Sequence, residues 1–174
     1  MRKFLLYFSI LFILSIVVFV RIFRSEPVTF KEVSVPGILT ISVPEYLSKK
    51  EDSTSSLLLR YENEKKQLFL LIYEEQDASG QSLQAIFKLF SDNLISKIEH
   101  GNLMKYYPEK INNHDAFIGN IRGKTNETCL YYRIAVIEAN KKYYEVIFGT
   151  SDDDQLFVDD DISESIRSIK FLIQ

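Results

Sequence analysis

Four strand-like runs follow one another between residues 103 and 150, and they constrain the fold more than any other feature of the sequence. The runs are LMKYYPEKI (103–111), AFIGNIRG (116–123), CLYYRIAVIE (129–138) and YYEVIFGT (143–150). Each is rich in β-branched and aromatic residues, which favour strands, and only short polar segments separate them. Connections of this length join antiparallel neighbours, so the sequence predicts an antiparallel meander.

The turn between the first two runs contains His114, one of two histidines in the chain. It follows Asn112 and Asn113, and asparagine is the best non-glycine residue for the left-handed backbone of a tight hairpin. Asp115 is adjacent, but neighbouring residues of a strand point to opposite faces, so it is badly placed to orient a catalytic imidazole. We interpret the segment as an exposed turn. The other histidine, His100, is interpreted as a residue at a helix C-terminus.

Two further segments have the period of a helix. Between residues 82 and 98, apolar side chains recur every three or four positions, and Ser79 or Ser82 can cap the start. A second stripe near the C-terminus consists of Val158, Ile162, Ile166 and Ile169. We expect the second helix to close over one side of the meander and the first to cover its own part of the core.

The beginning of the domain is strand-like as well. ILTISVPEYL predicts a strand that ends at Pro44, and the apolar runs 57–61 and 68–73 flank charged turn residues as in a hairpin. A short strand follows the terminal helix. The sequence thus predicts an α+β fold, an α/β/α sandwich whose mainly antiparallel sheet of hairpins plus meander is covered by two helices.

The first 24 residues differ from the rest of the chain. Residues 4–20 carry no charge, and at about 1.5 Å per residue this run is roughly 25 Å long. Ile22 and Phe23 extend it while Arg21 can reach the headgroups. The residues that follow offer no convincing small-residue cleavage site. We therefore expect residues 1–24 to form one N-terminal transmembrane helix, an uncleaved signal anchor, with a cleaved signal sequence as the alternative.

The charges beside this run predict its orientation. Basic residues stand at both ends, and the α-amino group together with Glu26 favours a cytoplasmic N-terminus. Residues 4–23 would then contact the membrane, and residues 25–174 would form a single extracytoplasmic domain of ordinary size. This predicts a single-pass protein of the inner or cytoplasmic membrane whose domain faces the periplasm or the cell exterior.

Composition argues against nucleic acid as a partner. Residues 1–24 hold four of the 21 basic residues and none of the 24 acidic ones, so the rest of the chain carries 17 against 24, a formal charge of -7. An acidic domain repels a phosphate backbone. The single cysteine, Cys129, cannot form an internal disulfide, and its place in an alternating stretch predicts a half-buried strand residue.

Two aspartate triplets, at residues 152–154 and 159–161, are the strongest candidate for a metal site in the sequence. A calcium loop needs oxygen ligands at alternating positions, a glycine for the bend and a final bidentate glutamate, and the triplets do not follow that spacing. We interpret them as acids before and within the first turn of the terminal helix, where they complement the positive end of its dipole. No metal site is assigned.

Catalytic constellations are not recognisable in the sequence. It contains no Ser/His/Asp set, no metal-spaced His/Cys cluster and no phosphate loop, so no catalytic, cofactor-binding or metal residue is assigned. The remaining enzymatic hypothesis is a hydrolase of unknown substrate. It would use a carboxylate acid/base pair from adjacent strands, either Glu74 with Glu75 or Glu138 with Glu145.

The order of these elements resembles the PsbP-like fold, whose members include the DcrB-like extracytoplasmic proteins of bacteria. The resemblance is carried by ISVPEYL, KINNHDAFIGNIRG, YYRIAVIEANKKYYEVIFGTSDDD and ISESIRSIKFL, and it covers roughly residues 28–173. It implies an α/β/α sandwich with a binding or assembly role, no shared catalytic activity and no residue-level site. The leading hypothesis is therefore a membrane-anchored binding or assembly module, not an enzyme, with a protein partner.

Overall fold

The computed structural model describes residues 27–51, 56–75, 80–125 and 128–172. No helix within these ranges is long and apolar enough to cross a membrane. The predicted anchor at residues 4–23 lies outside the described residues, as does Ser79, one of the two predicted helix caps.

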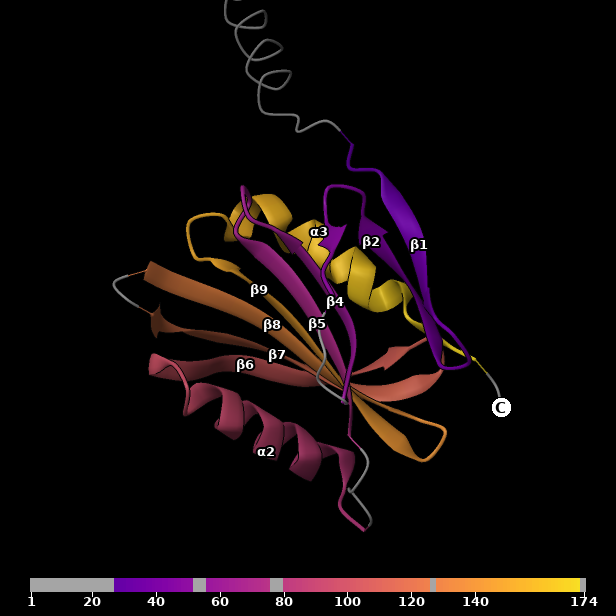
Figure 1. The fold of residues 1–174 in the computed structure, drawn as a ribbon. Coiled ribbons are helices and arrows are strands. Elements are labelled where there is room, and N and C mark those ends of the chain that lie inside the picture. The colour runs from indigo at the N-terminus through magenta and orange to yellow at the C-terminus, as the bar shows by residue number, and fades with distance from the viewer. Residues whose placement is uncertain (1–26, 52–55, 76–79, 126–127, 173–174) are drawn as a thin grey trace, which may run out of the picture.

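A seven-stranded sheet forms the middle layer of the fold (Figure 1). In spatial order its strands are β3 (Ser48–Lys49), β4 (Leu57–Asn63), β5 (Leu68–Glu75), β9 (Lys142–Ser151), β8 (Thr128–Ala139), β7 (His114–Thr125) and β6 (Glu99–Ile111). Every pair is antiparallel. The predicted meander is confirmed as β6 to β9, and β9 also pairs with β5, which joins the predicted hairpin to the meander.

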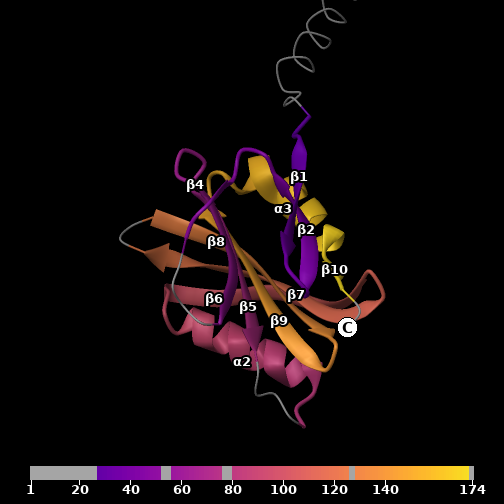
Figure 2. The ribbon, with the colours of Figure 1, turned by 45° about the vertical axis from the view of Figure 1, so that its right-hand side comes forward.

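A smaller sheet and two helices complete the described part of the chain. The small sheet consists of β1 (Phe30–Val35), β2 (Leu39–Pro44) and β10 (Lys170–Phe171), with β2 in the centre. Helix α2 (Leu83–Ile95) covers one face of the large sheet, and helix α3 (Gln155–Ser168) covers the other together with the small sheet (Figures 1 and 2). The predicted α+β fold with antiparallel sheets and two helices is confirmed for these residues.

Helix α2 begins and packs as its sequence pattern indicates. The Ser82 side chain accepts a hydrogen bond from the Ala85 backbone nitrogen at 3.2 Å, so Ser82 is the N-cap. The helix buries Phe87 against β7 at Gly119, where an added Cβ would lie only 2.6 Å from the Phe87 ring. Glycine at that position therefore lets the aromatic ring approach the sheet.

Helix α3 confirms the apolar stripe of the terminal segment. Val158, Ile162 and Ile166 are buried on its inner face, and Ile169 is buried as the extended residue that ends it. They join the residues of β2, β5 and β9 in one core cluster between α3, the small sheet and the large sheet.

The hairpin turns use left-handed asparagines, as predicted. Asn112 and Asn113 have φ of 45° and 72°, and Asn140 with Lys141 occupies the same region in the β8–β9 turn. The exposed position predicted for His114 is wrong. It is the first residue of β7, half-buried, and its ring lies 5.0 Å from the Phe171 ring because β10 passes beside the hairpin.

Two other single-residue predictions are also wrong. His100 is not at a helix C-terminus: α2 ends at Ile95, and His100 is an exposed residue of β6 with φ of 53°. Cys129 is exposed rather than half-buried, because it stands at the start of β8, where the first two strand residues are uncovered.

Candidate functional site

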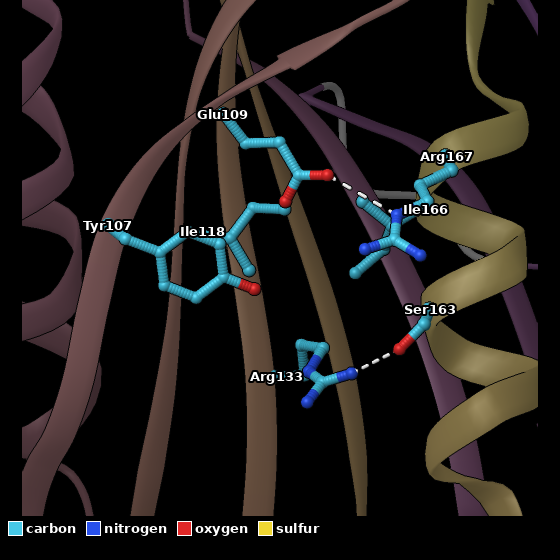
Figure 3. Close-up of a pocket in the computed structure, with 7 residues that line it drawn as sticks. All are labelled: Tyr107, Glu109, Ile118, Arg133, Ser163, Ile166 and Arg167. Atoms are coloured by element: carbon cyan, nitrogen blue, oxygen red, sulfur yellow. Dashed lines mark hydrogen bonds and ion pairs between the residues drawn. The ribbon is translucent and has the colours of Figure 1, made fainter.

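A polar groove lies between α3 and the strands β6 to β8, on the face of the large sheet opposite α2. We call it the α3 groove; it is lined by Tyr107, Glu109, Ile118, Arg133, Ser163, Ile166 and Arg167 (Figure 3). Strand residues reach it because alternate side chains of β6, β7 and β8 point toward α3. The free volume of the groove is about 10 Å³, which holds no more than about one water molecule.

Arg133 is the central cation of the α3 groove, and its side chain is only 13% exposed. Its Nη2 lies 3.1 Å from Asp159 Oδ1, and its Nε donates to Asn120 Oδ1 at 3.2 Å. Its Nη1 donates to Ser163 Oγ, as the dashed line in Figure 3 marks. A buried guanidinium must be paired and hydrogen-bonded to be tolerated, and these contacts from β7 and α3 meet that need.

Two tyrosines also bond to aspartates of α3. Tyr131 donates to Asp159 at 3.1 Å, and Tyr46 donates to Asp161 at 2.7 Å. Burial raises the pKa of Tyr131 to about 12. Burial, followed by the hydrogen bond to Asp161, raises the pKa of Tyr46 well above its usual range. Both hydroxyls therefore stay protonated and act as donors.

The predicted place of the second aspartate triplet, within the first turn of the terminal helix, is wrong, because α3 begins at Gln155 and its first turn holds no acidic residue. Asp159 and Asp161 lie beyond the first turn of α3 and contact different parts of the fold: Asp159 bonds to Arg133 of the large sheet, and the buried Asp161 bonds to Tyr46 after β2. Asp160 is exposed, as expected of a solvated acid. At about 100° per residue, the two residues that flank Asp160 point to nearly opposite sides of the helix, which places Asp159 against Arg133 and Asp161 against Tyr46.

Two members of the first triplet have polar partners. The Asp152 carboxylate lies 2.9 Å from Arg122 Nε, and Asp154 accepts a hydrogen bond from Ser151 Oγ at 2.7 Å. Within the described part of the chain, no three His, Cys, Asp or Glu side chains gather closely enough to hold a metal ion.

The outer edge of the α3 groove carries a second, more exposed ion pair. Arg167 Nε lies 3.3 Å from Glu109 Oε1, and the Arg167 side chain is 67% exposed. Beside it the outward side of α3 forms a shallow hollow of about 480 Å³ between Asp160, Ser163, Glu164, Arg167 and Ser168. This hollow has both signs of charge and is wider and more open to solvent than the space beside Arg133.

The α3 groove lacks the parts of a hydrolytic site. Ser163 Oγ donates to the Asp159 carbonyl oxygen at 2.8 Å and accepts from Arg133, and no histidine is among the lining residues. A serine nucleophile needs an adjacent base that can take its proton, and an arginine cannot do so. The arrangement can fix α3 on the sheet and present a charged outer edge.

The predicted pair Glu74 and Glu75 does not converge. The buried Glu74 accepts a hydrogen bond from Lys142 Nζ at 2.7 Å, whereas Glu75 is exposed and points to the opposite face of β5. The hydrogen bond to Glu74 raises the pKa of Lys142. Glu74 is thus an ion-pair residue.

The second predicted pair, Glu138 and Glu145, shares the α2 face of the large sheet. Glu138 is exposed and diagonal to Glu145, which is half-buried in the middle of the face. Burial, followed by repulsion from Glu75, raises the pKa of Glu145 to about 7, and Lys97 opposes the rise. The pKa of Glu145 therefore depends on Glu75, a member of the other predicted pair. Nothing in the sequence indicated that these two carboxylates would interact.

The central residues of the α3 groove were missed by sequence reasoning. Arg133 was visible as a lone cation within the otherwise apolar run CLYYRIAVIE. A charge among buried strand residues needs a partner, so Arg133 indicated that an ion pair would lie under the sheet surface. Nothing in the sequence indicated that the partner would be Asp159, because 26 positions separate the two residues.

These features define an α/β/α protein with a polar groove under its terminal helix. No known protein family matches the sequence, and no curated protein matches it either. Solved structures match the fold. The cyanobacterial PsbP protein CyanoP of Synechocystis aligns with a TM-score of 0.67 and 9% identity, over 86% of this chain and 96% of that chain.

Two further structures match over similar lengths. The Ran-binding protein Mog1p of Saccharomyces cerevisiae aligns with a TM-score of 0.64 and 11% identity, over 82% of this chain and 95% of that chain. LpqN, involved in cell envelope biogenesis of Mycobacterium tuberculosis, aligns with a TM-score of 0.54 and 11% identity, over 86% and 94%. The chain has a PsbP/Mog1-like fold, which confirms the resemblance drawn from its sequence; identities this low show the fold alone.

Proposed function

We propose that the chain is a membrane-anchored extracytoplasmic binding or assembly module. Residues 1–24 would be the anchor and residues 25–174 the single binding domain, held outside an inner or cytoplasmic membrane. The observation that carries the binding role is the α3 groove: its half-buried polar groups bond to one another around a space of about 10 Å³. Such a site has no room for a substrate.

The outer side of α3 is the surface that we assign to a protein partner. Asp160, Ser163, Glu164, Arg167 and Ser168 present charges and hydroxyls around the hollow of about 480 Å³. Asp159 bonds to Arg133 of the large sheet, and Asp161 bonds to Tyr46 after β2. These two contacts hold α3, and with it the outward residues, in place. A pre-ordered polar surface loses little conformational entropy on binding. Mog1p is described as Ran-binding and LpqN as involved in envelope biogenesis, and both roles fit a binding module.

Site-specific crosslinking in the native membrane tests this assignment. We expect a photocrosslinking residue at Glu164 to give a discrete adduct, because it lies in the hollow. The same residue at Lys88, which is exposed on α2 at the other face of the sheet, is the matched control. Arg167→Glu should abolish the adduct at position 164. Equal adducts at both positions, or none at position 164, would contradict the proposed surface.

Fractionation tests the anchor separately. The full chain should sediment with membranes, resist extraction by salt and alkali, and dissolve in detergent, because about 20 apolar residues suffice to span a bilayer. A chain that begins at Ser25 should be soluble and should unfold cooperatively. Release of the full chain by alkali, or a truncated chain that is insoluble under native conditions, would refute the anchor or the domain boundary.

A carboxylate-dependent hydrolase is the second candidate, and one observation favours it. The pKa of Glu145 is raised to about 7, as general acids require at neutral pH. The test is hydrolysis of nitrophenyl esters or glycosides across a range of pH. A rate that changes with the ionisation of one group near pH 7, and that is lost in Glu145→Gln, would support an enzyme. Activity that survives this substitution unchanged would remove Glu145 from consideration.

A further inference from the structure

The described chain begins at one end of the domain, and this end is fixed by hydrogen bonds. Thr29 Oγ1 donates to Glu45 Oε2 at 2.8 Å, and the Glu45 backbone nitrogen donates to the Thr29 carbonyl oxygen at 2.9 Å. Glu45 directly follows β2, whose last residue, Pro44, pairs with Phe30 of β1. The point at which the chain enters the domain is therefore attached to the loop after β2.

Helix α3 starts at the same end. Ser168, its last residue, accepts a hydrogen bond from the Ser42 backbone nitrogen at 2.8 Å, and Asp161 bonds to Tyr46 at 2.7 Å. The helix thus runs antiparallel to β2, and its first turn lies beyond Asp161 toward the entry point of the chain. Figures 1 and 2 both show the starts of β1 and α3 in the upper part of the domain.

The first turn of α3 exposes two large apolar side chains in succession. Leu156 is 87% exposed and Phe157 is 77% exposed, more than any other exposed large apolar residue in the described ranges. Phe157 lies four positions before Asp161, about 6 Å along the helix axis. Single exposed apolar residues are ordinary. Two adjacent ones form an apolar patch, and such patches mark surfaces that contact an apolar partner.

The sequence before Pro27 indicates which apolar partner lies beside Leu156 and Phe157. The apolar N-terminal run ends at Phe23, and only residues 24–26 separate it from Pro27. A fully extended chain advances at most about 3.6 Å per residue, so Pro27 lies within about 14 Å of the end of that run. If residues 4–23 span a bilayer, this end of the domain is held beside the lipid headgroups.

We propose that this end is a membrane-docking surface, with Leu156 and Phe157 inserted into the interface of the bilayer that holds the anchor. The inference rests on the proposed function and specifies how the domain is oriented. Aromatic and aliphatic side chains enter the headgroup and acyl boundary readily. Exposed acids, Asp153 and Asp160, lie within four positions of this pair in the chain, and Lys66 Nζ lies 4.0 Å from the ring of Tyr46, the partner of Asp161. Charges of both signs at this end of the domain offset one another, so we assign the docking to apolar contact.

A single tryptophan tests the proposal in the full chain, because the native sequence contains no Trp. Phe157→Trp places the probe in the surface, and Leu89→Trp places it at a 62% exposed position of α2, across the large sheet. Each variant is reconstituted into phosphatidylcholine vesicles that contain brominated lipid. We expect the emission of the Trp at position 157 to be blue-shifted and quenched at least threefold more than that at position 89, with little change in high salt.

Each outcome decides one of the two proposals. If both variants float with the vesicles but are quenched equally or not at all, the docking surface is refuted and the anchor stands. If neither variant floats, the anchor fails and the docking inference fails with it. Selective quenching that disappears in Leu156→Ser, while flotation and the thermal unfolding transition stay unchanged, supports docking by the apolar pair. Quenching that this substitution leaves intact would overturn the role of the pair.

Discussion

The two faces of the large sheet are covered by helices that are held in different ways. On the α2 face Phe87 and Phe90 of α2 pack against apolar residues of β7, β8 and β9. On the α3 face an apolar core of similar kind is combined with the bonds of Asp159 to Arg133 and of Asp161 to Tyr46.

This difference explains why the candidate site lies under α3. Apolar contacts are non-directional and tolerate small shifts of a helix, whereas charge-assisted hydrogen bonds fix both distance and direction. Ser163 and Arg167 are therefore held at defined positions over β6 and β8. The α2 face provides stability, and the α3 face adds a defined arrangement of polar groups.

The largest expected effects come from the two cores, and they should be similar. Phe87→Ala on the α2 face should lower the free energy of unfolding by about 3 to 5 kcal/mol, and Ile166→Ala on the α3 face by about 2 to 5 kcal/mol, because both side chains are buried and leave cavities. Denaturant titration measures both. A near-neutral Ile166→Ala would mean that the polar contacts alone hold α3.

The polar contacts should make a smaller contribution, and only on the α3 face. Asp161→Ala leaves the Tyr46 hydroxyl without its acceptor and should cost about 1 to 3 kcal/mol. Asp160→Ala is the matched control, because Asp160 is exposed and its replacement brings the same gain in helix propensity. Equal unfolding free energies for the two variants would refute the role assigned to Asp161.

On the α2 face the strongly perturbed carboxyl of Glu145 should make stability depend on pH. The pKa of Glu145 is raised from 4.5 to about 7 in the folded chain, so the folded state binds the proton more tightly than the unfolded state. Its contribution to stability is therefore complete below about pH 4.5 and is lost as the pH rises through about 7.

Glu145→Gln should remove this dependence. We expect the variant to match the parent near pH 4 and to exceed it by about 1 to 2 kcal/mol at pH 8, a value reduced for the partial exposure of the side chain. Glu138→Gln on the same face is exposed and should show no such difference. Unfolding curves at the two pH values decide, and an equal gain at both would contradict the pKa assignment.

The smallest effect is expected at the turn beside the α3 face. His114→Ala removes the ring contact with Phe171 but leaves the left-handed turn at Asn112 and Asn113 intact, so it should cost about 0.5 to 1 kcal/mol. Asp115→Ala, at an exposed neighbouring position, should cost less. Loss of a partner adduct in His114→Ala with unchanged stability would assign the histidine to binding instead.

The sequence by itself determined the elements and the fold class. The alternation in residues 103–150, the Asn112–Asn113 turn and the stripe of Val158, Ile162 and Ile166 depend on local backbone geometry and on which side chains avoid water. Both act within a few residues, so they can be read along the chain. The structure confirms these three features and the PsbP/Mog1-like fold.

Only the tertiary structure decided which polar residues meet. Arg133 pairs with Asp159, and Tyr46 pairs with Asp161 across 115 positions. These contacts depend on where along β8 and β2 the helix α3 packs. The sequence showed the aspartates as a run of acids and gave no sign of which ones face inward. The pKa of Glu145 likewise depends on Glu75 and Lys97 from other elements. Contacts between distant segments depend on how whole elements pack, and no local pattern in the sequence encodes that packing.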